Sequence, residues 1–189
     1  MRLYDIFKRR DDGRCEPVAP VPLEPMDAKP KTGMAKLVAV VGAAAVGLVA
    51  VVGQWEGKSN DPYKDIVGVW TVCYGETNTD MRRYSDAECS DMLAGSLADY
   101  ATVVLNRNPE LRGHDAQVLA ASSLTYNIGG AAYSRSTVAK RFSEGRWRSA
   151  CNAMLMWNKA GGKVVNGLTR RRQAERAICL RDIPAGKDK

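Results

Sequence analysis

The sequence contains a single histidine, His114, and no cluster of residues with metal-ligand spacing. A Ser-His-Asp mechanism therefore has only one candidate base, which stands at a polar helix start where side chains are usually exposed. Lysine and arginine runs interleaved with aromatic residues are also absent, which disfavours nucleic acid as a partner although the net charge is +7. The positive charge is equally compatible with anionic lipid or an acidic polymer.

Strongly hydrophobic runs are scarce too, and the long uncharged stretch at residues 37–53 is only weakly apolar. It consists of seven valines, five alanines, three glycines and two leucines. As one helix it would span about 26 Å, slightly less than the hydrocarbon core of about 30 Å. Lys29, Lys31 and Lys36 precede it, which favours a cytoplasmic N-terminus and an exported C-terminal domain. Residues 34–54 are therefore predicted to be a weak, reversible membrane anchor.

Three other interpretations of this stretch stay open. A cleaved signal peptide fits the small residues, but the segment before it is long for such a peptide. A permanent anchor would need more leucine, isoleucine and phenylalanine than the stretch contains. A buried core helix has the same length.

The segment before the anchor, residues 1–33, holds five of the eight prolines together with mixed charges. Such a composition buries little apolar surface, so a disordered cytoplasmic tail is expected. A short C-terminal tail is expected at residues 183–189.

The five cysteines are distributed unevenly around the anchor. Cys15 precedes it, whereas Cys73, Cys89, Cys151 and Cys179 follow it. This placement fits a reducing cytoplasm on one side and an oxidising periplasm on the other. Cys73–Cys89 and Cys151–Cys179 are the preferred disulfides among three pairings, because each closes a local loop between adjacent predicted elements. Four unpaired core thiols are the alternative.

Residues 55–182 are predicted to form one α+β domain, a small β region followed by a mostly helical body. The β-branched run at residues 66–75 predicts a short hairpin or small sheet, after a turn at Asn60-Asp61-Pro62. From Ser85, which forms a capping box with Glu88, the periodicity becomes helical. This helix is expected to reach about Leu105, and further helices are expected near 115–127, 136–144, 146–157 and 169–180.

Glu56, Asp65 and Thr71 are the candidate catalytic residues. Two carboxyl groups beside a cleft suit glycosidic cleavage, where one acts as the general acid and the other assists the attacking water or the sugar cation. A threonine hydroxyl near the second carboxylate can help to position that water. Their spacing alone is weak, because Asp65 could cap a turn and Thr71 could be an ordinary strand residue.

The surrounding motifs are more specific than the three residues by themselves. These motifs are Trp55-Glu56-Gly57, Asp61-Pro62-Tyr63-Lys64-Asp65, Gly68-Val69-Trp70-Thr71, Tyr74-Gly75, Tyr126-Asn127-Ile128-Gly129, Trp157 followed by Gly161-Gly162, and the arginine-rich run from Gly167 to Arg176. Together they resemble the phage-type lysozymes, glycoside hydrolase family 24, over residues 54–181. With the weak anchor before them, the sequence is most similar to the signal-anchor-release endolysins, which phages use to lyse Gram-negative hosts.

The resemblance implies a lysozyme-like fold and cleavage of the β-1,4 bond between N-acetylmuramic acid and N-acetylglucosamine in peptidoglycan. Glu56 would be the general acid, Asp65 the second carboxylate, and Thr71 would help to hold the attacking water. Tyr126 and Asn127 would line the sugar cleft, although a packing role at a helix end is equally open. No metal or organic cofactor is implied.

The same resemblance implies a monomer that is exported to the host inner membrane, tethered and inactive, and then released into the periplasm. A phage holin or pinholin would trigger that release. Two alternatives are a virion-associated lysozyme that aids genome delivery and a non-catalytic peptidoglycan-binding anchor.

Two features complete the expectations for the site. Glu76 replaces a histidine that many members of the family carry after the glycine, and it is interpreted as a local structural substitution. Four arginines of the last helix are predicted to form a solvated face, with contact to peptidoglycan carboxylates as the minority alternative: Arg170, Arg171, Arg172 and Arg176.

Overall fold

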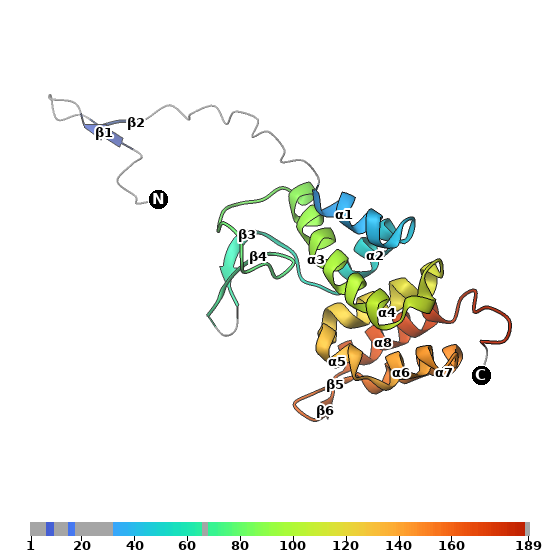
Figure 1. Cartoon of the computed structure of the whole chain (residues 1–189). Coiled ribbons are helices and arrows are strands. Elements are labelled where there is room, and N and C mark those ends of the chain that lie inside the picture. Colours follow the sequence, from blue (N-terminus) through green and yellow to red (C-terminus); the bar gives the residue numbers. More distant parts are fainter. Residues whose placement is uncertain (1–6, 10–14, 18–31, 66–67, 188–189) are drawn as a thin grey trace.

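The computed structural model of the chain describes residues 7–9, 15–17, 32–65 and 68–187 (Figure 1). Within the predicted tail, β1 (Phe7–Arg9) pairs in antiparallel fashion with β2 (Cys15–Pro17). Residues 32–33 of that tail begin a helix, and the remainder lies outside the described residues, so its predicted disorder stays a prediction.

The stretch that the sequence predicted as one helix forms two helices, α1 (Thr32–Val41) and α2 (Ala44–Gly53). Their axes are bent by 117°. Gly42 lies at the break with a φ of +56°, a backbone conformation that residues with a Cβ rarely adopt. In the described part of the chain, no single helix is long and apolar enough to cross a membrane, although α1 and α2 together have the length and composition to do so.

Both helices of this stretch pack into the hydrophobic core. Leu37, Ala45, Leu48 and Val52 are completely buried. In Figure 1, α1 (blue) and α2 (cyan) lie beside α3 (Asp86–Arg107, green), the long helix of the domain. The apolar surface that a membrane span would turn toward lipid is thus partly used to build the core.

The N-terminal end of α1 docks on α3 through unusually close backbone contact. The amides of Gly33 and Met34 donate to the two carboxylate oxygens of Asp91, at 3.1 and 2.9 Å. A Cβ at Gly33 would lie 1.9 Å from the carbonyl oxygen of Asp91 and 2.8 Å from the amide nitrogen of Gly95. Asp91 therefore satisfies two free amides of the first turn of α1, and only glycine fits at position 33.

The helical body follows α3, and its predicted helices are confirmed within a few residues. They are η2 (Pro109–Leu111), α4 (Asp115–Ile128), α6 (Thr137–Ser143), α7 (Trp147–Ala153) with η3 (Met154–Met156), and α8 (Asn166–Cys179). Two further elements were not predicted from the sequence, α5 (Gly130–Ser134) and the hairpin of β5 (Lys159–Ala160) with β6 (Lys163–Val164).

The β region is a hairpin in which β3 (Ser59–Lys64) pairs with β4 (Trp70–Cys73). The predicted run at 66–75 supplies only the second strand, and the turn predicted at Asn60-Asp61-Pro62 is wrong because these residues lie within β3. The register shifts between Ser59 and Tyr63. Proline is tolerated at such an irregularity, since its missing amide need not pair there.

Two disulfides connect the elements of the domain, and both match the preferred pairing. Cys73–Cys89 joins β4 to α3, and Cys151–Cys179 joins α7 to α8. The first of them holds the β hairpin, and with it Thr71, against the first turns of α3.

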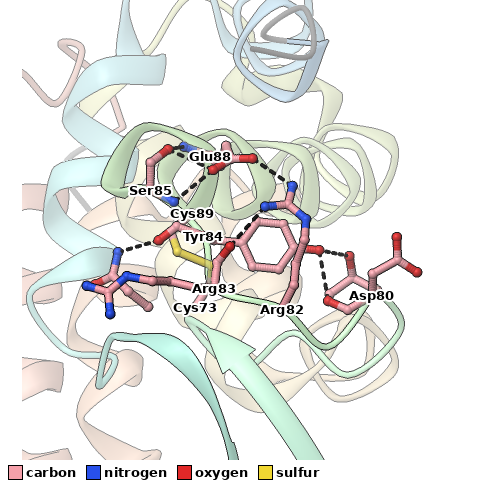
Figure 2. A network of polar contacts seen from close by, with 10 residues as sticks. Cys73, Asp80, Arg82, Arg83, Tyr84, Ser85, Glu88 and Cys89 are labelled. Atoms are coloured by element: carbon pink, nitrogen blue, oxygen red, sulfur yellow. Dashed lines mark hydrogen bonds and ion pairs between the residues drawn. A yellow bond between two sulfur atoms is a disulfide. The ribbon is translucent and has the colours of Figure 1, made fainter. Parts of the chain in front are cut away.

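A polar network reinforces this hairpin–helix junction (Figure 2). Ser85 and Glu88 form the predicted capping box at the start of α3. Glu88 also accepts a hydrogen bond from Arg82 at 2.7 Å, and the Arg82 guanidinium lies 3.8 Å from the centre of the Tyr84 ring. The bonds from Arg82 and from the Ser85 amide lower the pKa of Glu88 to about 2.

Glu88→Gln is expected to lower the free energy of unfolding by about 1–2 kcal/mol near neutral pH, through loss of the ion pair and half of the cap. A carboxyl pKa lower in the folded than in the unfolded state stabilises the fold above about pH 4.5. That contribution disappears as the pH falls toward about 2. Urea unfolding at a series of pH values should therefore show the two proteins converging under acid. Glu144→Gln, which removes a more exposed ion pair with Arg146, should change little at any pH.

Candidate active site

Glu56 lies directly after α2, in a turn whose Glu56 amide donates to the Val52 carbonyl at 3.2 Å. Its side chain is 24% exposed and accepts a hydrogen bond from Arg171 of α8, with 2.6 Å between Nη1 and Oε1. The position of Glu56 therefore depends on two contacts far apart in sequence, the docking of α2 and the arginine of α8.

Arg171 and Arg172 are buried, so the prediction that they form part of a solvated helix face is wrong. Arg171 is 4% exposed and Arg172 is completely buried. Both pair with the buried carboxylate of Glu175, at 3.2 Å from each arginine Nε. Among the four arginines of the predicted face, Arg170 alone is exposed, while Arg176 is half-buried and donates to Asn152.

Burial changes the titration of this ionic cluster. It raises the pKa of Glu175, although Arg172, Ser123 and Arg171 act in the opposite direction. Burial likewise lowers the pKa of Arg172 to about 10. Ser123 of α4 donates to Glu175 at 2.7 Å, which gives this carboxylate a neutral partner besides the two cations.

Asp65 and Thr71 lie close together at the β3–β4 hairpin, and each bonds to Val69. The Val69 amide donates to the Asp65 carboxylate at 2.8 Å, while the Thr71 hydroxyl donates to the Val69 carbonyl at 3.1 Å. Thr71 is 4% exposed and pairs with Tyr63 across the hairpin. Asp65 thus caps the turn, as the alternative interpretation expected, and it shares Val69 as a partner with the Thr71 hydroxyl that the catalytic interpretation requires.

Tyr126 of α4 connects the two parts of the candidate site. Its hydroxyl donates to the carbonyl of Tyr74, directly after β4, at 3.3 Å, and its ring meets Tyr100 edge-on at 5.3 Å. Burial raises the pKa of Tyr126, and the negative charges of Glu56 and Glu76 raise it further. Tyr126 therefore bonds to the segment that follows β4 and interacts electrostatically with Glu56.

Asn127 follows Tyr126 but is exposed, and its Oδ1 accepts a hydrogen bond from Arg172 at 3.0 Å. The arginine holds this amide in one orientation, with its NH₂ group left to bind another group. Tyr126 packs on Tyr100 and stays partly exposed, whereas Asn127 presents a polar group at the surface.

The sequence did not predict that Arg171, Arg172 and Glu175 form a buried ionic cluster beside Glu56. A usable signal was the i,i+4 spacing of Arg171 and Glu175 within a helix that has few apolar residues. Burial of such a pair could not be read from α8 alone, because α4 and Glu56 cover it.

Glu76 and His114 both have structural partners. Ser96 of α3 donates to the Glu76 carboxylate at 3.0 Å, which fits the local structural role predicted for this substitution. His114 is half-buried rather than exposed, and its ring meets Trp147 edge-on at 4.8 Å.

Comparison with known proteins defines the class to which this fold and site belong. The sequence model of the Phage lysozyme family matches residues 53–175, so the chain belongs to the phage lysozyme family. The SAR-endolysin of Enterobacteria phage P21 is 40% identical over 149 residues, covering 74% of this chain and 88% of that protein. The match to the family model begins at residue 53, close to Glu56, and ends at Glu175.

Solved structures show the same architecture. An endolysin from Escherichia coli O157:H7 phage FAHEc1 superposes with a TM-score of 0.65 at 25% identity, over 75% of this chain and 93% of that one. The muramidase domain of SpmX from Asticaccaulis excentricus superposes with a TM-score of 0.63 at 28% identity, over 71% of this chain and 95% of that one. The predicted lysozyme-like α+β fold is confirmed.

Proposed function

We propose that this chain is a phage endolysin that hydrolyses the β-1,4 bond between N-acetylmuramic acid and N-acetylglucosamine in host peptidoglycan. The observation that supports it most is the placement of Glu56. A half-buried carboxyl group at the end of α2 is oriented by Arg171, inside a phage lysozyme domain.

Glu56 is the general acid of this mechanism. Arg171 binds its Oε1, so Oε2 is the oxygen that carries the proton to the glycosidic oxygen. As the bond to the leaving sugar breaks, Glu56 becomes a carboxylate, and the adjacent guanidinium stabilises that new charge. Arg171 thus favours the product side of the proton transfer.

Asp65 and Thr71 act on the water side of the reaction. The Thr71 hydroxyl and the Asp65 carboxylate, both bonded to Val69, hold a water that attacks the anomeric carbon. Asp65 accepts the proton that this water loses. Tyr126 and the exposed amide of Asn127 contact the sugar between these two groups.

Digestion of purified Gram-negative peptidoglycan tests this function. The expected products carry new reducing ends on N-acetylmuramic acid, which mass spectrometry identifies after borohydride reduction, and chloroform-treated cells should lose turbidity. Binding to peptidoglycan without new reducing ends would instead indicate a non-catalytic anchor.

We also propose that residues 34–54 tether the chain to the host inner membrane, with residues 1–33 in the cytoplasm and 55–182 in the periplasm. The structure then corresponds to the released form, in which α1 and α2 pack on α3 and α4. In the tethered form α2 is absent from the core, so Glu56 is separated from Arg171 and the enzyme is inactive. Collapse of the membrane potential by a holin would permit release, and fractionation with an uncoupler tests this.

Gly42→Ala is expected to favour the tethered form. Alanine at a φ of +56° destabilises the bent, released form by about 1–2 kcal/mol, while it stabilises a straight helix by about 1 kcal/mol. After an uncoupler is added, a larger fraction of the variant should stay with the membrane, and lysis should be delayed. Gly47→Ala is the matched control, because Gly47 lies inside α2 with a helical backbone, and its new methyl group would approach only the end of the Leu119 side chain. Equal release of Gly42→Ala and wild type from the membrane would contradict the proposed release mechanism.

A further inference from the structure

Glu56 and three residues of α8 form a series of four ionisable side chains with balanced charge. Glu56 contacts Arg171, Arg171 and Arg172 both contact Glu175, and the sum of the four charges is zero when all are ionised. Arg171, Arg172 and Glu175 are each 5% exposed or less. Water screens such a cluster poorly, so a change in one charge affects the others.

We propose that Glu175 and Arg172 form a charge-balanced pair that fixes Arg171 against Glu56 and sets the pH range in which Glu56 holds its proton. They are positioning residues, since they act on the substrate only through Arg171 and Glu56. The inference rests on the proposed role of Glu56 as the acid.

The geometry shows how Glu175 orients Arg171. One guanidinium is shared between two carboxylates, with its Nε 3.2 Å from Glu175 and its Nη1 2.6 Å from Glu56. Its Nη2 reaches the Ser123 carbonyl at 3.4 Å. Glu175 and α4 therefore hold one edge of the guanidinium, which leaves the other edge directed at Glu56.

Arg172 balances the remaining charge but is itself poorly hydrogen-bonded. Its Nη2 donates to Asn127, whereas among the described residues its buried Nε and Nη1 have no hydrogen-bond acceptor. The 3.2 Å contact between its Nε and Oε2 of Glu175 is an ion pair without hydrogen-bond alignment. Burial of a guanidinium with so few hydrogen bonds is unfavourable. Arg172 therefore contributes to this cluster through its positive charge and not through hydrogen bonding.

Removing the charge of Glu175 and removing the charge of Arg172 are expected to have opposite effects on proton loss from Glu56. With Glu56 protonated the cluster carries +1, and proton donation makes it neutral. Glu175→Gln raises these values to +2 and +1, so Glu56 loses its proton more readily. Arg172→Gln lowers them to 0 and −1, so Glu56 keeps its proton to higher pH.

Other groups also face this cluster and remain in every variant. Tyr126 of α4 interacts electrostatically with both Glu56 and Glu76, Tyr100 of α3 packs on Tyr126, and Asp65 lies in the β3–β4 hairpin. Their charges contribute equally to all the proteins compared, so differences between variants report the α8 pair.

The experiment measures the initial rate of peptidoglycan cleavage by the released full-length chain from pH 4 to 9, and titrates the Glu56 carboxyl by ¹³C NMR. The alkaline limb of the pH–rate profile is the range in which the acid loses its proton. This limb should move down by about one pH unit in Glu175→Gln and up by a similar amount in Arg172→Gln. Arg170→Gln removes an exposed charge from the same helix and should leave the limb in place.

The double variant Arg172→Gln/Glu175→Gln keeps the cluster balanced and covers the case in which a single variant does not fold. Its alkaline limb should match wild type, but its rate should fall about tenfold because Arg171 is no longer anchored. An unchanged rate in the double variant, or limb shifts of equal sign in the two folded single variants, would overturn the proposal. If Glu56→Gln also stays active, the proposed function fails as well, which separates the two outcomes.

Discussion

Glu56→Gln should reduce the cleavage of purified peptidoglycan by about 100-fold to 10,000-fold, the range expected when a general acid is removed. Glutamine has the same shape and can still accept the hydrogen bond from Arg171, but it cannot donate a proton at the required step. The release of new reducing ends measures the effect. The far-ultraviolet circular dichroism spectrum should not change, because Glu175 continues to pair with Arg171.

The control for this substitution is Glu144→Gln, the same chemical change at a solvent-facing ion pair of α6. It should keep full activity. If Glu56→Gln stayed active, the acid would have to be another group, and the proposed role of the α2–α8 contact in positioning the catalytic acid would be lost.

Gly33→Ala should destabilise the released form by about 3 kcal/mol or more, because the new methyl group overlaps the backbone of α3. The clash is with the Asp91 carbonyl and the Gly95 amide, neither of which can rotate away. Docking of α1 and α2 should therefore fail or be strained, with loss of lytic activity at 37 °C and a melting temperature lower by about 5–10 °C.

Membrane insertion should be unaffected by this change, since alanine is no more polar than glycine. Gly47→Ala again serves as the matched control. Its new methyl group would approach only the end of the flexible Leu119 side chain, at 3.1 Å, so its effect should stay within about 1 kcal/mol. A Gly33→Ala variant with unchanged melting temperature and activity would show that α1 does not dock on α3 as described.

Local sequence patterns determined much of the structure of this protein. The capping box of Ser85 with Glu88 marks the start of α3 because both partners lie within one turn. The two disulfides could be predicted because each closes a short loop between neighbouring elements. The proximity of Asp65 and Thr71 could also be predicted, because the two residues are close in sequence and belong to one hairpin.

The tertiary structure decided the features that depend on contacts between distant segments. The same apolar composition suits a membrane span and a core helix, so the sequence could not show that the stretch bends at Gly42 and packs on α3. The first strand of the hairpin was misassigned because turn-forming residues lie at an irregular part of β3.

Arg171 and Arg172 illustrate the same limit at the site itself. Charged residues on a helix are solvated unless another segment covers them, so α8 alone predicts an exposed face. Here α4 and Glu56, separated from α8 by tens of residues, supply the partners that make burial of these charges tolerable. The sequence by itself predicts Glu56 as the acid, whereas the orientation of its side chain depends on long-range packing, because the arginine that binds it lies 115 residues away.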